Sequence, residues 1–292
     1  MLNVNERKIT ATITAVSPIS HAGFSEVSTG NSMMFRRVPC VSLPGFPEIP
    51  VVSGNALRGI MRRRLMTEVY NKVGFTFEKF KDVFSSEQTA KRAWDKLYAA
   101  LFCGGTLNGK LEDTTDPIEL RKIREQFPAL SLLGSALYTK MLPGMAQIGF
   151  AWLICDESIR GELVTKTDDT LVIKAEDAIT EIGQVRHIDR ENADPEITGV
   201  TPMPITIECL APGASLQSNI SLLPQTTSIE KSCLIHGLKL IDHIGGKLSS
   251  GYGAVKMHIT ENDDDEYTSW IKNSSNNEAF ENFLIEMAKG MI

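Results

Sequence analysis

The order of strand-like and helix-like patterns along the chain is the feature that most constrains its fold. Residues 8–17, KITATITAVS, alternate apolar and threonine side chains, which is typical of a half-buried strand. Apolar residues recur at helical spacing over residues 54–73, and the apolar stretch 146–157 predicts a second strand. Within residues 203–223, two alternating runs flank Ala-Pro-Gly-Ala and predict a hairpin.

The C-terminal third completes the pattern. An amphipathic helix is predicted over residues 226–244, and a glycine-rich loop then leads into a strand over 253–259. The acidic residues 262–266 indicate a solvated turn, and residues 277–290 a terminal helix. The order strand, helix, strand, hairpin, helix, strand predicts an α+β fold, in which a ferredoxin-like or RRM-like antiparallel sheet carries helices on one face.

Long segments interrupt this plan, and we interpret them as insertions into one domain spanning residues 1–292. Residues 18–50 are rich in Pro, Gly, Ser and Asn and predict a long loop or short irregular strands. A helical insertion covers about 66–145, with helices over 77–102 and 117–126. The charged, turn-rich residues 158–200 form a second insertion.

Composition excludes several classes of protein. A hydrophobic content of 42% indicates a globular chain rather than a disordered or fibrous one. A net charge of -6 argues against a protein that binds DNA indiscriminately along its length. The sequence shows neither a signal peptide nor a membrane-length apolar run, so we expect a cytoplasmic protein with no membrane partner. The five cysteines and five histidines form no metal motif or catalytic constellation, so we expect no metal, no cofactor and no catalytic residue.

The stretch PVVSGNALRGIMRRRL, residues 50–65, concentrates positive charge in this acidic chain, with four arginines in seven positions. Ser53 or Asn55 is a good N-cap, and the free amide groups at the start of a helix favour an anion. The apolar stripe at 100° per residue is formed by Leu57, Ile60, Met61 and Leu65. An ordinary capped surface helix with solvated arginines is the alternative.

The four arginines differ in where this stripe places them. Arg58, Arg62 and Arg63 lie off it, so replacing Arg58 and Arg62 should leave the fold intact. Arg64 lies within it and must extend to solvent or find a partner.

Two further stretches offer contacts for nucleic acid. Phe35 stands beside Arg36 and Arg37, so its ring could stack on a base while the guanidinium groups hold phosphates; alternatively Phe35 is a core residue. The loop within residues 243–259 presents a lysine, hydroxyls and an aromatic ring among glycines. It fits neither a Walker loop nor a dinucleotide fingerprint, and the alternative is a tight connector that requires positive φ angles.

Three of these motifs together resemble the RAMP superfamily of CRISPR-associated proteins. IPVVSGNALRGIMRRRL resembles the family's signature before its basic helix, GGKLSSGYGAVKM its glycine-rich loop, and SPISHAG the element that closes its first strand. The similarity spans residues 8–260 and is greatest to the repeated backbone subunit of multi-subunit (class 1) effector complexes, of type IV or a related type I form. It implies an RRM-like core with insertions, of which 158–200 would be a thumb-like hairpin.

The resemblance implies which residues contact a guide RNA. Ser53, Asn55, Arg58 and Arg62 would hold the guide backbone, and Lys247, Ser249 and Tyr252 would be the contacts of the glycine-rich loop. Arg186 and His187 would be contacts of the thumb-like hairpin. Together with the residues singled out by their charge or aromatic character, the predicted RNA-binding residues are His21, Phe35, Arg36, Arg37, Ser53, Asn55, Arg58, Arg62, Arg63, Arg186, His187, Lys247, Ser249 and Tyr252.

The function implied is a guide (crRNA)-binding backbone subunit that polymerises along the RNA spacer and presents it for pairing, without cleaving it. Its partners would be guide RNA, further copies of itself, other effector-complex subunits, and target DNA or RNA through pairing with the guide. Slicing relatives place an aspartate shortly before the basic helix, and no aspartate lies between His21 and Pro50 here. A metal-independent RAMP endoribonuclease using His21, and an unrelated α+β enzyme that binds an anionic ligand, are the alternatives.

Overall fold

A six-stranded antiparallel sheet forms the base of the molecule, with strand order β13-β1-β12-β9-β5-β4. The computed structural model describes residues 2, 4–27, 32–107, 116–138, 140–165, 172–185, 204–274 and 278–291. The strands of this sheet are β1 Lys8–Ala15, β4 Arg37–Pro39, β5 Glu48–Val52, β9 Ala146–Leu153, β12 Ser215–Leu222 and β13 Val255–Ile259.

The RRM-like plan is confirmed. Helix α1, Gly54–Val73, follows β1, and helix α7, Ser228–Lys239, connects β12 to β13. The chain order β1-α1-β9-β12-α7-β13 and the spatial order β13-β1-β12-β9 are those of a ferredoxin-like βαββαβ unit. The fold is therefore α+β with an antiparallel core, as the sequence predicts.

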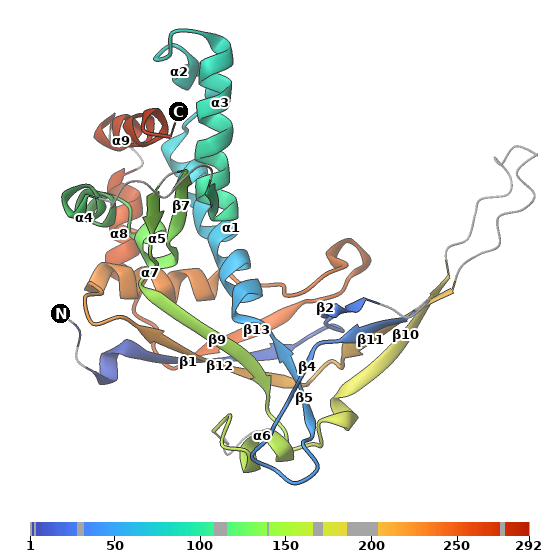
Figure 1. Cartoon of the computed structure of the whole chain (residues 1–292). Coiled ribbons are helices and arrows are strands. Elements are labelled where there is room, and N and C mark those ends of the chain that lie inside the picture. The colour runs from blue at the N-terminus through green and yellow to red at the C-terminus, as the bar shows by residue number, and fades with distance from the viewer. Residues whose placement is uncertain are drawn as a thin grey trace, which may run out of the picture.

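One face of the sheet is covered by helices, as Figure 1 shows. In β1, Ile9, Ala11 and Ile13 are buried while the threonines between them are only half-buried, because successive side chains of a strand point to opposite faces. Helices α1 and α7 cross closely at Gly237, where a Cβ atom would lie 2.7 Å from Cγ of Met61. A larger residue at position 237 would require the side chains of Met61 and Leu65 to shift, so glycine allows the two helices to pack at this distance.

A helical layer lies between α1 and β9 in the sequence. The predicted helix over 77–102 is broken, because Ser86 starts a new helix by accepting a hydrogen bond from the N–H of Thr89 at 3.2 Å. The elements are α2 Phe77–Lys81, α3 Glu87–Tyr98, the π-helical turn η2 Ala99–Cys103, β6 Gly105–Leu107, α4 Pro117–Gln126, α5 Pro128–Leu133, β7 Ser135–Tyr138 and β8 Lys140–Leu142. Strands β6, β7 and β8 form a small sheet of their own.

Two C-terminal helices, α8 Asp265–Ser274 and α9 Glu278–Lys289, join this layer (Figure 1). The prediction of a solvated acidic turn over 262–266 missed α8. Asp265 is the first residue of α8, and Asp264 before it accepts hydrogen bonds from His236 and Lys239 instead of facing only solvent.

A second sheet has the order β10-β11-β3-β2, and one side of it forms an arm (Figure 1). The arm is the antiparallel pair β10 and β11; β10 lies inside the thumb-like insertion predicted over 158–200, and β11 follows that insertion. The strands of this sheet are β2 Ala22–Val27, β3 Ser32–Phe35, β10 Ile179–Val185 and β11 Pro204–Leu210. For residues 18–50 the sequence predicts either a long loop or short irregular strands, and the structure has short strands there.

The hairpin predicted over 203–223 is wrong in its pairing. Both strands exist, but β11 pairs with β10 and β3, whereas β12 pairs with β1 and β9. At the Ala-Pro-Gly-Ala turn, the N–H of Gly213 donates to the carbonyl of Ala15 at 2.8 Å, so the turn carries the chain from one sheet to the other.

The remaining elements are short. Strand β9 ends at Leu153, earlier than predicted, because α6, Asp156–Arg160, begins soon after it. The single-turn helices are η1 Asn5–Arg7, η3 Glu176–Ala178 and η4 Leu248–Ser250. Across the described ranges, no helix has both the length and the apolar character needed to cross a membrane.

Candidate nucleic-acid interface

The loop that follows β1 lies directly against the glycine-rich loop from the other end of the sequence. The N–H of Gly253 donates to the carbonyl of Pro18 at 2.8 Å, and the N–H of Gly246 donates to the carbonyl of Ser20 at 2.9 Å. Gly245 has φ +88°, and a Cβ atom there would lie 2.3 Å from the carbonyl oxygen of Ser20. Only glycine fits this contact, so the alternative of a tight connector that requires positive φ angles is confirmed.

His21 connects this pair of loops to the start of α1. Its Nε2 accepts a hydrogen bond from the N–H of Ser53 at 3.2 Å, so that nitrogen carries no proton. Burial lowers the pKa of His21, and the positive charge of Arg36 lowers it further. Ser53 is the N-cap of α1, since its Oγ accepts from the N–H of Ala56 at 3.3 Å. The three motifs of the resemblance therefore meet in space.

Cationic groups lie beside the place where His21, the start of α1 and the glycine-rich loop meet. Arg36 is half-buried, forms no ion pair with any described residue, and donates its backbone N–H to the carbonyl of His21 at 2.8 Å. Arg37 instead pairs with Glu208 across 2.8 Å, so its charge is neutralised. Asn55, on the first turn of α1, is exposed. The N-terminus of this 20-residue helix adds a partial positive charge.

Phe35 is a core residue. Its side chain is 0% exposed and packs edge-on against the ring of His21, with 6.3 Å between the ring centroids. The interpretation of Phe35 as a base-stacking residue is therefore wrong, and the alternative that places it in the core is confirmed. Its backbone N–H donates to the Glu208 carboxylate at 2.8 Å, which also holds Arg37.

The predicted placement of Arg58 and Arg62 is also wrong. Arg62 is only 5% exposed, and its Nη2 donates to the carbonyls of Leu133 and Gly134 at 3.1 and 2.7 Å. Arg58 donates to the carbonyl of Leu133 at 3.4 Å and to that of Ala146, the first residue of β9, at 2.7 Å. Burial, followed by the nearby Arg58, lowers the pKa of Arg62 to about 10. Both guanidinium groups hold the helical layer against α1, so neither is a free surface charge.

The glycine-rich loop is bonded to the arm near the C-terminal end of β10. Lys247 donates from Nζ to Oε1 of Gln184 at 3.0 Å, and Nε2 of the same side chain donates to the hydroxyl of Tyr252 at 3.1 Å. Tyr252 is buried, whereas Ser249 is exposed. Sequence reasoning missed Gln184, because an isolated glutamine on a strand has no motif that marks it.

The candidate interface is thus formed by His21, Arg36, Ser53, Asn55, Lys247 and Ser249. Arg63 is exposed but lies farther along α1, and Arg64 finds the partner that its position requires, in Asp242. Arg186 and His187 lie outside the described residues. Within those residues, no group of three or more His, Cys, Asp or Glu side chains could hold a metal ion.

Comparison with solved structures relates the fold to a known assembly. The chain is similar to one from a structure described as "Type IV-B CRISPR Complex", with a TM-score of 0.58 and 16% sequence identity. The match covers 87% of this chain and 90% of that chain, so the likeness extends beyond the RRM-like core into the insertions. No protein-family model matches the sequence, and no curated protein does so either.

Proposed function

We propose that this protein is a subunit of a CRISPR effector complex that binds guide RNA as a backbone component and polymerises along it. The observation that carries the proposal is the meeting of His21, the N-terminus of α1 and the glycine-rich loop, with Arg36 and Lys247 beside them. Backbone amides, a helix N-terminus and two cations in one place suit the phosphates of a single strand.

The fold supports the same role. A likeness that covers 87% of the chain to a component of a type IV-B CRISPR complex favours assembly with other complex subunits over an isolated enzyme. The arm formed by β10 and β11 extends away from the sheet and gives the chain a means to reach a neighbouring copy or the RNA between two copies (Figure 1). Target DNA or RNA would then join through pairing with the guide.

Binding without cleavage is part of the proposal. The Nε2 atom of His21 is occupied by the N–H of Ser53, and the lowered pKa of His21 keeps the ring neutral at physiological pH. A neutral ring with an occupied acceptor is a poor proton donor to a leaving group. This arrangement favours a structural role for His21 over the ribonuclease alternative.

The binding test replaces Arg36 and Lys247 together by glutamine. We expect affinity to fall for all RNA sequences alike, and the slope of log K against log salt to become shallower by about 1.4, since each phosphate contact to a single strand contributes about 0.7. The matched control replaces Lys91 and Arg92, an exposed lysine and arginine on α3, by glutamine. An unchanged slope in the first variant would contradict the proposed interface.

The cleavage test incubates the purified protein with labelled repeat RNA and with guide-complementary RNA, with and without Mg²⁺ or Mn²⁺. The proposal expects both RNAs to stay intact. Specific cuts that disappear in a His21→Ala variant would favour the endoribonuclease instead.

A further inference from the structure

A groove of about 630 Å³ runs along the flank of α1, beyond the candidate interface. One wall is α1 itself, and the other is the segment that follows α7, from Leu240 to Leu248. We call it the α1 groove, and the residues that line it include Ile60, Arg63, Thr67, Asn71, Lys72 and Leu248. The wall formed by the segment after α7 includes Gly245, which belongs to the glycine-rich loop, so the groove is continuous with the candidate interface.

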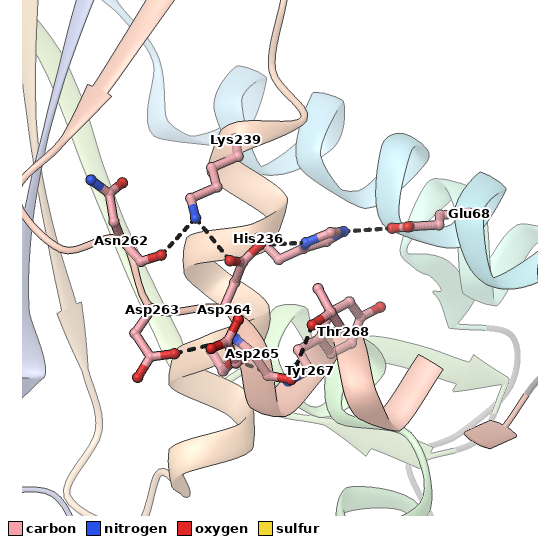
Figure 2. Close-up of polar contacts among 10 residues, drawn as sticks. Glu68, His236, Lys239, Asn262, Asp263, Asp264, Asp265, Tyr267 and Thr268 are labelled. Atoms are coloured by element: carbon pink, nitrogen blue, oxygen red, sulfur yellow. Dashed lines mark hydrogen bonds and ion pairs between the residues drawn. The ribbon is translucent and has the colours of Figure 1, made fainter. Parts of the chain in front are cut away.

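The acidic residues of the groove already have cationic partners. Oε2 of Glu68 lies 2.7 Å from Nε2 of His236, and Nδ1 of the same ring lies 2.8 Å from Oδ2 of Asp264 (Figure 2). Ionised carboxylates only accept hydrogen bonds, so both ring nitrogens must carry protons and His236 is a cation. At the other wall, Asp242 pairs with Arg64.

Arg63 and Lys72 are the cations of the groove left for a ligand. Both are exposed, and neither forms an ion pair with any described residue. Arg63 extends back toward the candidate interface, since its Nη1 lies 3.5 Å from the position that a Cβ atom on Gly59 would take. Lys72 lies nine positions after Arg63, which corresponds to about 13 Å along the helix axis. One small anion cannot bridge that distance, whereas a polyanion can.

We infer that the α1 groove binds the phosphodiester backbone of a nucleic-acid strand that continues from the candidate interface. Arg63 and Lys72 hold successive stretches of the backbone, and Leu248, which lines the groove and is 51% exposed, offers apolar surface to a base or ribose. The inference rests on the proposed function, because it extends the path of the same strand.

The test measures affinity for oligouridines of increasing length. A short oligomer fills only the candidate interface, and a longer one also reaches the groove. For the Arg63→Gln, Lys72→Gln double variant we expect unchanged binding of the short oligomer. For the long one we expect a loss of about tenfold or more and a salt slope shallower by about 1.4, because two phosphate contacts are removed. The variant that replaces Lys91 and Arg92 serves as the matched control.

A second measurement locates the strand directly. A photo-crosslinker on an Asn71→Cys variant, at a position that lines the groove beside Lys72, should capture the long oligomer and not the short one. If the double variant binds the long oligomer as the control does, and Asn71→Cys captures nothing, the groove inference is overturned while the proposed function stands. If the wild-type protein binds neither oligomer, the proposed function fails and the groove inference fails with it.

Discussion

Two flanks of α1 carry arginines that are neighbours in the sequence and lie in opposite environments. Arg62 is buried and bonded to the carbonyls of Leu133 and Gly134, whereas Arg63 is exposed beside a groove. The buried side of α1 is wide, because α7 packs against it at Met61 and Leu65 while the helical layer packs against Arg58 and Arg62. A helix buried from two directions has no single apolar stripe. Positive charge on such a helix can therefore join two layers or bind a ligand, and only its partners distinguish the two.

Of the substitutions that test this contrast, we expect Arg62→Ala to have the largest effect on stability. The substitution removes the donor to the carbonyl of Gly134 and the nearer of the two donors to that of Leu133, and it opens space beside α1. We therefore expect the free energy of unfolding to fall by about 3 kcal/mol. Urea unfolding followed by circular dichroism measures it. A variant as stable as the wild type would place Arg62 among the dispensable surface charges and break the comparison.

The next effect concerns Glu68, which is on the exposed flank and yet is held by a partner. Hydrogen bonding to Glu68 raises the pKa of His236. The other charged groups around the ring are Asp264 and Lys239, and Nζ of Lys239 lies 2.8 Å from Oδ1 of Asp264 (Figure 2). Because the folded pKa exceeds the unfolded value of about 6.5, the stabilisation is fully present below that value and is lost as pH rises through the folded pKa.

His236→Gln tests this dependence. At pH 6 we expect the variant to be less stable than the wild type by about 2 kcal/mol, because charged hydrogen bonds joining α1, α7 and the start of α8 are lost. The difference should shrink as pH rises. Thermal unfolding across a pH series measures both proteins, and a difference that stays constant would show that His236 does not titrate in this network.

A smaller effect is expected from Gln184→Ala, which disconnects the arm from the glycine-rich loop. The variant loses the bonds to Lys247 and Tyr252, for a cost of about 1 kcal/mol. Hydrogen–deuterium exchange should become faster in β10 and in the loop and stay unchanged in α1. Equal exchange in β10 before and after the substitution would mean that the arm is held by other contacts.

The smallest effect is expected from Arg63→Ala. Because this side chain is exposed and forms no ion pair with a described residue, its removal should change stability by no more than about 0.5 kcal/mol. The same urea series that measures Arg62→Ala provides the comparison. A loss of more than about 1 kcal/mol would show that Arg63 is a structural residue like its neighbour.

These contrasts show what periodicity could and could not predict. The alternation over 8–17 and the helical spacing over 54–73 located β1 and α1, because apolar residues recur in each at the period of its secondary structure. The pairing of β11 and β12 was mispredicted, since a strand's partner can come from anywhere in the chain and both of these strands have distant ones. Helix α8 was missed because its acidic start is typical of a turn.

The features of the site were predictable where the local sequence alone determines the backbone geometry. Ser53 as N-cap and the positive φ of Gly245 follow from residue type and local spacing. The burial of Arg62 depends on carbonyls at 133 and 134, and the bond between Lys247 and Gln184 depends on the fold of the arm. No local pattern holds such information, because these partners come from segments far apart in the sequence.

The most direct test of the central claim, that this chain is a backbone subunit assembling on guide RNA, counts its copies on RNAs of increasing length. Several weak contacts on one strand reinforce each other through effective concentration, and a head-to-tail contact that does not close gives a filament whose length the RNA sets. Mass photometry should show copy number rising stepwise with RNA length. A copy number that stays at one or two on every RNA would contradict the account.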